Sequence, residues 1–131
     1  MRKVCAFFGH RDTSSKIEPL IEKQIRRLII EKGVNTFWIG GYGWFDIYAS
    51  GILRKLKREY PNIHIVLVAA YIQQLHRGRD NFFDSFDYPA EVEAAPYKLA
   101  IPVRNRYMVK NADYIICLLY TSPSPRDGLL S

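Results

Sequence analysis

The sequence predicts an α/β protein whose open, mainly parallel sheet carries helices on both faces. Short β-prone runs alternate with segments of helical periodicity along the chain, which is the pattern of strand–helix–strand units. The run "IHIVLVAA" at 63–70 is apolar at nearly every position, as expected for a strand that is buried on both faces of a sheet. The chain has no internal repeat, and a single domain is expected over residues 1–119.

The first half of the chain alternates regularly. A β-prone run at 3–8 is followed by apolar residues at helical spacing from Ile17 onward, and Gly33 closes that helix. A second strand is expected at 36–39. It leads into a second helix over 47–60, whose apolar residues again lie on or near one face.

The second half is less regular. Residues 71–101 are rich in aromatic residues and prolines, with one short strand expected around 85–88. Pro102 is well placed to start a helix that runs to Ala112, because proline is favoured at the first position of a helix. The apolar run "YIICLL" at 114–119 is the last strand that the pattern predicts.

Residues 120–131 differ from the rest of the chain. The segment "YTSPSPRDGLLS" has no periodicity and contains two Ser-Pro steps at the point where another strand-to-helix turn is due. We predict that it is either disordered or a foreign, non-native tail, and we favour the second interpretation.

Composition limits the classes of function. The formal net charge of +6 suits an anionic partner such as a nucleotide, although many of the basic residues fall on the polar faces of expected helices. No apolar run approaches the ~20 residues of a membrane span, and no signal peptide opens the chain. We therefore expect a cytoplasmic protein with no membrane association. Cys5 and Cys117 each lie in an apolar run and are expected to be reduced core thiols.

The strongest candidate for a functional site is the turn "GGYGWFD" at 40–46. Gly40, Gly41 and Gly43 join a strand to a helix, so they would direct free N–H groups toward the crevice at the carboxyl ends of the strands. The turn is not a P-loop, because no G-K-[ST] follows, and Asp46 stands where the dinucleotide fingerprint needs glycine. That carboxylate would repel a phosphate and suits a helix N-cap or an acceptor for ribose hydroxyls. A plain tight turn is the alternative.

Two further polar motifs fall near strand ends. In "GHRD" at 9–12, Gly9 permits close approach and Arg11 could pair with a phosphate, although a capping loop with a surface arginine is equally favoured. In "RNRYM", Arg104 and Asn105 fall in the first turn of the last expected helix, where N–H groups and the helix dipole favour an anion.

No metal site and no cofactor are expected. The three histidines are scattered along the chain and show no metal-ligand spacing. They are His10, His64 and His76.

In their order and spacing, the motifs "CAFFGHR", "GGYGWFD" and "RNRYMVKNADYII" resemble the YpsA-like branch of the SLOG superfamily. The resemblance covers residues 1 to about 119 and implies a Rossmann-like fold with the first and last strands adjacent at the sheet centre. Cys5 and Cys117 would then lie in neighbouring strands. The superfamily includes the lonely-guy phosphoribohydrolases and the DNA-processing protein A group, so the resemblance also implies a nucleotide or nucleotide-derived ligand.

The resemblance assigns roles to individual residues. The glycines of 40–46, with Asp46, match the first glycine-rich loop of the family and its acidic residue. Arg104, Asn105 and Met108 resemble the R-[NK]-x-x-M element, whose arginine lies at the nucleotide phosphate in the lonely-guy enzymes.

The resemblance fails after the last strand. Asp113 matches the aspartate that precedes that strand, where a role in the turn is favoured over a catalytic one. The family then has a second glycine-rich loop, which carries an essential glutamate in the phosphoribohydrolases, but "YTSPSPRDG" stands there in this chain. A C-terminally truncated Rossmann-like domain is therefore expected, one that binds nucleotides weakly and turns none over.

Three functions stay open. The leading one is a nucleotide-binding or nucleotide-sensing domain with a nucleotide-like small molecule as its partner. The second is an N-glycosidic hydrolase acting on a nucleoside monophosphate, for which Asp46 is the available carboxylate. The third is single-stranded DNA binding, which the basic charge and the aromatic residues permit but the scatter of Lys and Arg over helix faces disfavours. An assay for released base and a salt-dependent oligonucleotide shift would separate them.

Overall fold

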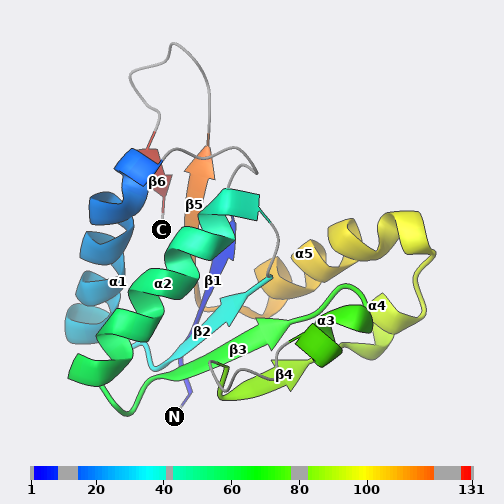
Figure 1. Ribbon diagram of the computed structural model, residues 1–131, viewed down its shortest axis with the longest axis horizontal. Helices are drawn as coiled ribbons and strands as arrows, with labels where there is room; N and C mark the ends of the chain where they lie inside the picture. Colours follow the sequence, from blue (N-terminus) through cyan, green and yellow to red (C-terminus); the bar gives the residue numbers. More distant parts are fainter. Residues whose placement is uncertain (1, 9–14, 41–42, 78–82, 120–127, 131) are drawn as a thin grey trace.

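A computed structural model of the protein shows a six-stranded sheet with helices on both of its faces (Figure 1). It describes residues 2–8, 15–40, 43–77, 83–119 and 128–130. The strands are β1 (Val4–Phe8), β2 (Thr36–Ile39), β3 (His64–Val68), β4 (Ser85–Asp87), β5 (Tyr114–Leu119) and β6 (Gly128–Leu130). The helices are α1 (Glu18–Lys32), α2 (Gly43–Glu59), α3 (Gln73–Arg77), α4 (Ala90–Glu93) and α5 (Ala100–Asn111), with 3-10 turns η1 (Ser15–Ile17) and η2 (Tyr97–Leu99).

The strand order is β4-β3-β2-β1-β5-β6. The first five strands are parallel, and β6 pairs antiparallel with β5. This confirms the expected α/β class with a mainly parallel, Rossmann-like sheet. Strand order reverses between β1 and β5, because β2 to β4 extend the sheet on one side of β1 and β5 lies on the other. The carboxyl ends of the strands at such a reversal are where open α/β sheets bind their ligands.

The central pair of strands matches the expectation for the two cysteines. In the register of β1 with β5, Cys117 lies opposite Phe8 and Cys5 lies opposite Tyr114, so the cysteines are in neighbouring strands. Both thiols are free, but Cys117 is only partly buried, which corrects its expected place in the core. Cys5 is completely buried, and burial raises the pKa of its thiol. It is therefore an inert core residue, as predicted.

Two apolar layers cover the sheet. Alternate residues of β1 point to opposite faces: Cys5 and Phe7 join the layer under α1 and α2, whereas Val4 and Ala6 join the layer under α5. Met108 of α5 is 1% exposed and lies in the second layer. The two layers explain why β1 is apolar at every position. Figure 1 shows α1 and α2 on the near face and α5 behind the sheet.

Two helices begin earlier than predicted. The helix expected over 47–60 starts at Gly43, and the helix expected from Pro102 starts at Ala100. Pro102 is the third residue of its helix, where its missing N–H costs nothing because the first N–H groups of a helix have no intrahelical partner. The helix at 17–33 agrees closely with the prediction, and Gly33 ends it in the left-handed conformation with φ 69°.

Residues 71–101 contain more structure than the pattern indicated. The short strand expected around 85–88 is confirmed as β4, and two short helices, α3 and α4, flank it. Residues 128–130 form β6, while 120–127 lie outside the described residues, so a non-native tail stays a prediction. In the described parts of the chain, no helix is both long and apolar enough to cross a membrane.

Candidate functional site

The candidate site centres on Gly40, the residue that follows β2 at its carboxyl end. Gly40 is buried, and its carbonyl oxygen accepts two hydrogen bonds from side chains rather than from a neighbouring strand. Arg104 Nη1 of α5 donates at 2.7 Å, and Gln74 Nε2 of α3 donates at 2.8 Å. Residues from three distant parts of the chain therefore meet where the glycine-rich turn begins.

Arg104 is 4% exposed, so its guanidinium is part of the protein interior. Besides the Gly40 carbonyl, Nη1 lies 3.5 Å from the carbonyl oxygen of Val68, the last residue of β3. Its Nε donates to Oδ1 of Asn105 at 3.0 Å. The arginine thus joins the ends of β2 and β3 to α5, and Asn105 helps to orient it.

This position corrects the expected placement of Arg104 and Asn105 in a first helical turn. Because α5 starts at Ala100, both residues lie in its second turn, away from the N–H groups that would attract an anion. The side chain of Arg104 reaches the glycine-rich turn instead. The structure brings Arg104 and Gly40 together; that either binds a ligand stays a prediction.

Only glycine fits at position 40 in this arrangement. A Cβ built on Gly40 would stand 2.7 Å from Cζ and Nη1 of Arg104 and 2.9 Å from Nη2. These separations are shorter than any normal contact, so a side chain at residue 40 would displace the guanidinium. The glycine is needed here for the close approach of Arg104 and not for an unusual backbone angle.

Gln74 is the site residue that the sequence analysis missed. It is 6% exposed, and its Oε1 accepts hydrogen bonds from the backbone N–H of Ala70 at 2.6 Å and of Tyr71 at 3.2 Å. With its bond to Gly40, the one amide side chain connects the exit of β2 to the exit of β3. The signal for it was weak: a polar residue a few positions after a buried strand, in a segment expected to be irregular.

Asp46 lies in the first turn of α2 and is 9% exposed. Because the helix begins at Gly43, Asp46 is not its N-cap, which corrects one of the two roles expected for it. A carboxylate in the first turn is stabilised by the positive end of the helix dipole. Gly43 is the first residue of that helix, so the turn at 40–43 leads directly into a helix N-terminus.

Three of the expected ligand-binding residues, Gly9, Arg11 and Gly41, lie outside the described residues. Asp113 is described and lies at the opposite end of the strands from Gly40. Its Oδ2 accepts from the backbone N–H of Val4 at 2.8 Å, which connects the amino-terminal ends of β1 and β5. This is the structural role that was favoured for it.

Tyr107 on α5 lies near the site but serves packing. Its ring stacks on Trp38 with 5.6 Å between centroids, and its hydroxyl donates to Oδ2 of Asp87 at 2.9 Å. Burial, together with that hydrogen bond, raises the pKa of Tyr107 to about 12. The phenol therefore stays protonated at neutral pH and is not poised for acid–base chemistry.

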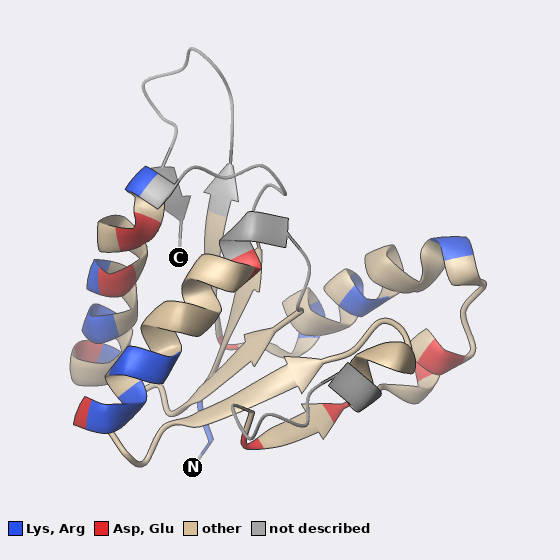
Figure 2. Ribbon diagram, in the orientation of Figure 1, with Lys and Arg blue, Asp and Glu red and all other residues tan. Residues whose placement is uncertain are grey.

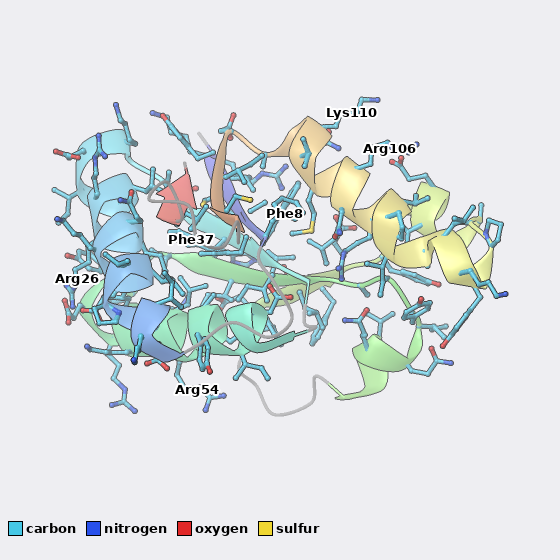
Figure 3. All side chains as sticks on the ribbon, turned by 90° about the horizontal axis from the view of Figure 1, so that it is seen from above. Phe8, Arg26, Phe37, Arg54, Arg106 and Lys110 are labelled. Atoms are coloured by element: carbon cyan, nitrogen blue, oxygen red, sulfur yellow. The ribbon has the colours of Figure 1, made fainter. Side chains whose placement is uncertain are left out.

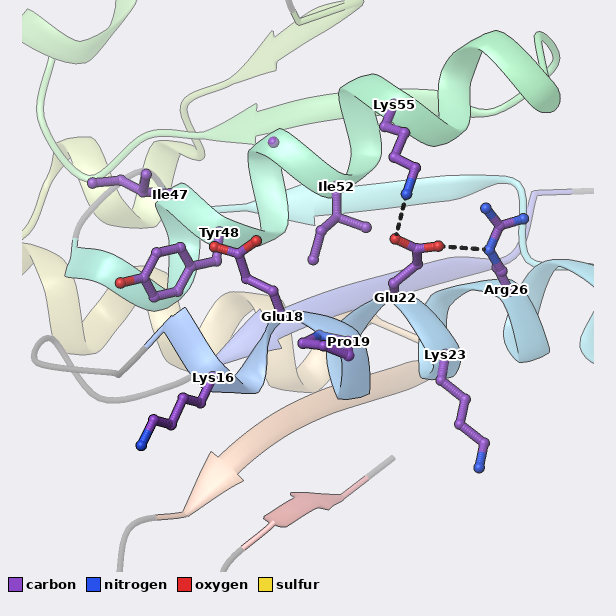
Figure 4. A pocket seen from close by; sticks show the side chains of 11 residues that line it. Lys16, Glu18, Pro19, Glu22, Lys23, Arg26, Ile47, Tyr48, Ile52 and Lys55 are labelled. Atoms are coloured by element: carbon purple, nitrogen blue, oxygen red, sulfur yellow. Dashed lines mark hydrogen bonds and ion pairs between the residues drawn. The ribbon is translucent and has the colours of Figure 1, made fainter.

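A groove lies between α1 and α2, away from these residues (Figure 4). Charged side chains line it, and Glu22 accepts from both Lys55 at 2.9 Å and Arg26 at 3.0 Å. None of the expected site residues is among its lining. Basic and acidic residues alternate along α1, whereas in α2 the basic residues gather in the second half of the helix (Figure 2).

In the described ranges, no three His, Cys, Asp or Glu side chains are grouped so that they could hold a metal ion. The hydrogen-bonding groups gathered around Gly40 are an arginine, an amide and backbone carbonyls.

The sequence of the chain also matches a known protein family. The family model for YpsA, described as the YspA SLOG family, matches residues 2–125. The chain belongs to the YpsA family of SLOG proteins. The resemblance in the motifs is thereby confirmed, and at the level of the family it supports a nucleotide-related, Rossmann-like domain.

A similar protein is the UPF0398 protein BH1768 of Halalkalibacterium halodurans, which is 25% identical over 118 residues. The aligned part is 83% of this chain and 61% of the relative. This SLOG chain therefore spans less than two thirds of the length of the relative it matches.

Proposed function

We propose that this SLOG domain binds a nucleotide or nucleotide derivative, with a phosphate against the turn that joins β2 to α2. The observation that carries the proposal is the anchoring of Gly40. Two buried side chains, Arg104 and Gln74, hold its carbonyl at the residue where the turn begins. An ordinary surface turn needs no such anchoring, whereas a binding turn gains affinity from being pre-organised.

The helix that follows the turn also favours a phosphate. The turn leads into α2, a helix of 17 residues that starts at Gly43, and the free N–H groups and dipole of a helix N-terminus favour a phosphate. The carboxyl end of β1 lies beside that of β2, and the strand order reverses between β1 and β5. A ligand at the turn would therefore lie next to the end of β1.

In this proposal Arg104 acts through the turn. Its Nη1 is bound to the Gly40 carbonyl, so its main effect is to hold the loop in place beside the ligand. Asp46, in the first turn of α2, is the acceptor that we assign to the ribose hydroxyls. A carboxylate at that place would also suit N-glycosidic hydrolysis, and incubation with AMP followed by an assay for free adenine separates binding from turnover.

A nucleic-acid ligand is less well supported. On α1 the basic side chains are interleaved with acidic ones, and Arg26 pairs with Glu22 and Glu59. The basic residues of α2 are partly paired as well, Lys55 with Glu22 and Lys57 with Asp84. A backbone-binding groove needs a continuous basic track. We therefore propose a small-molecule partner.

Substitution of Arg104 tests the proposal. Titration of AMP into Arg104→Ala, followed by NMR so that weak binding is measurable, should show weaker binding because the turn loses the donor that holds the Gly40 carbonyl. The loss should reach at most about 150-fold, the limit if all of the ~1.5–3 kcal/mol of that charge-assisted bond pre-organises the turn. Arg104→Lys should recover little, because an ammonium does not reproduce the guanidinium geometry.

The matched control is Arg106→Ala on the same helix. Figure 3 shows Arg106 on the outer side of α5, directed away from the sheet, and the residue is exposed. Its removal takes away the same charge but should leave AMP affinity unchanged. If a folded Arg104→Ala protein binds AMP as the wild type does, the anchoring of Gly40 contributes nothing to binding, and the observation that carries the proposal is removed.

A further inference from the structure

A pair of stacked tyrosines stands beside the candidate site. The rings of Tyr71 and Tyr97 lie 4.5 Å apart between centroids, inclined by 30°, and the Tyr71 hydroxyl donates to the carbonyl oxygen of Tyr97 at 3.0 Å. Tyr71 follows β3 at its carboxyl end, and Tyr97 opens the 3-10 turn that leads into α5. The pair therefore belongs to the same edge of the sheet as Gly40.

Tyr97 is largely uncovered. It is 73% exposed, the highest value among the large hydrophobic residues that are described. Leu99, two residues further along the chain, and Ile72, which follows Tyr71, are exposed as well. Tyr71 covers one side of its ring, so the other side is open to solvent.

The tyrosines are connected to the glycine-rich turn through Gln74. Its Oε1 accepts from the N–H of Tyr71 at 3.2 Å, while its Nε2 donates to the carbonyl of Gly40 at 2.8 Å. Neighbouring strands are about 4.8 Å apart, so the exits of β2 and β3 are close enough for one small ligand to contact both. Tyr97 and Arg104 lie on consecutive elements, η2 and α5.

We infer that the open face of Tyr97 is a stacking platform for the base of the bound nucleotide, with the phosphate of the same molecule at the glycine-rich turn. This rests on the proposed function and narrows the ligand to one with a planar aromatic base on a sugar phosphate. Stacking on an aromatic ring tolerates every base, because each base has a π-face. The platform thus selects nucleotides over plain sugar phosphates without selecting one base strongly.

The test compares two ligands that share a phosphate, AMP and ribose 5-phosphate, by NMR titration of wild type, Tyr97→Ala and Tyr97→Trp. Wild type should bind AMP about 5- to 150-fold more tightly than ribose 5-phosphate, the range that corresponds to the ~1–3 kcal/mol of one base–aromatic stack. Tyr97→Ala should lose most of this difference, leave ribose 5-phosphate affinity unchanged, and stay folded because the ring is exposed. Tyr97→Trp should keep the preference.

The outcomes distinguish the stacking platform at Tyr97 from the phosphate site at the glycine-rich turn. If both ligands bind and Tyr97→Ala leaves the preference for AMP intact, the platform is wrong and the phosphate site stands. Equal loss of both ligands in Tyr97→Ala would show that the ring only supports the structure, and it too overturns the platform. If wild type binds neither ligand, the proposed function itself is wrong and the platform falls with it.

Discussion

The guanidinium of Arg104 occupies the space that any side chain at Gly40 would need. A Cβ at residue 40 would lie 2.7 Å from Cζ of Arg104, while Nη1 of the arginine donates to the Gly40 carbonyl at 2.7 Å. The two residues are 64 positions apart in the chain, so this contact fixes α5 against the end of β2. A side chain at residue 40 therefore requires the buried guanidinium of Arg104 to move.

Gly40→Ala should destabilise the protein because the new methyl group must displace a buried guanidinium. Overpacking of an interior typically costs about 1–3 kcal/mol, and we expect a loss of that size in the free energy of unfolding. Urea denaturation followed by circular dichroism measures it. Combined with Arg104→Ala, which removes the obstructing group, Gly40→Ala should cost clearly less than it does alone.

Gly51→Ala provides the matched control for a glycine-to-alanine change. Gly51 lies within α2 and is exposed, and a Cβ there would meet no described atom within 4 Å. Since alanine is the better helix former, this variant should gain up to about 1 kcal/mol. Equal effects of the two substitutions would contradict the steric argument.

Gln74→Ala should destabilise the protein at the carboxyl ends of β2 and β3. The change removes the acceptor of the buried Ala70 N–H and a donor to the Gly40 carbonyl. A buried group left without its hydrogen bond costs roughly 1–3 kcal/mol, so we expect a loss at the upper end of that range or above it.

Gln74→Glu keeps the two acceptor positions for Ala70 and Tyr71 but replaces the donor to Gly40 with an oxygen. It places two oxygens against each other and should be no more stable than Gln74→Ala at neutral pH. Substitution of Gln73, the exposed neighbour, by alanine is the control and should have little effect. A Gln74→Ala protein as stable as this control would show that the bonds of Gln74 contribute nothing.

Protonation of Asp84 should make the protein less stable in acid. Burial opposes its charge, but the Ile65 N–H at 2.7 Å and the Lys57 ammonium at 3.0 Å outweigh burial and hold the pKa of Asp84 below its ordinary value. A carboxylate with a depressed folded-state pKa adds stability above its unfolded pKa, and this contribution is lost as the pH falls through the folded value.

Asp84→Asn should therefore lower the free energy of unfolding at neutral pH, with a difference from wild type that shrinks as the pH falls. Lys57→Met, which removes the ammonium partner of Asp84, should reproduce part of this effect. Urea denaturation at a series of pH values measures both variants. A constant difference between Asp84→Asn and wild type across the acid range would show that ionisation of Asp84 does not matter.

Much of the fold could be predicted because the signals are local. The strands at 36–39 and 114–119 match the sequence pattern, as does the helix that Gly33 ends. The helix starts were placed too late where glycines or a proline precede the periodic run, because α2 and α5 include those residues in their first turns. Capping geometry, which a pattern of apolar residues does not contain, decides such boundaries.

The site could be predicted only in part for a related reason. The glycine-rich turn and Arg104 stood out by residue type and position in the sequence. The roles of Gln74 and Tyr97 depend on contacts between segments 34 and 26 residues apart, Gln74 with Gly40 and Tyr97 with Tyr71. No local pattern marks such contacts, since they exist only once β2, β3 and α5 are packed together.

The most direct test of the central claim is an NMR titration of the backbone amides of the wild-type protein with AMP. If the nucleotide binds where the anchored turn leads into α2, the largest shift changes should occur at Gly40, Asp46 and Tyr71, with little change along the α1–α2 groove around Glu22 and Lys55. Shift changes centred on that groove, or none at millimolar AMP, would contradict the assignment of the carboxyl edge as a nucleotide site.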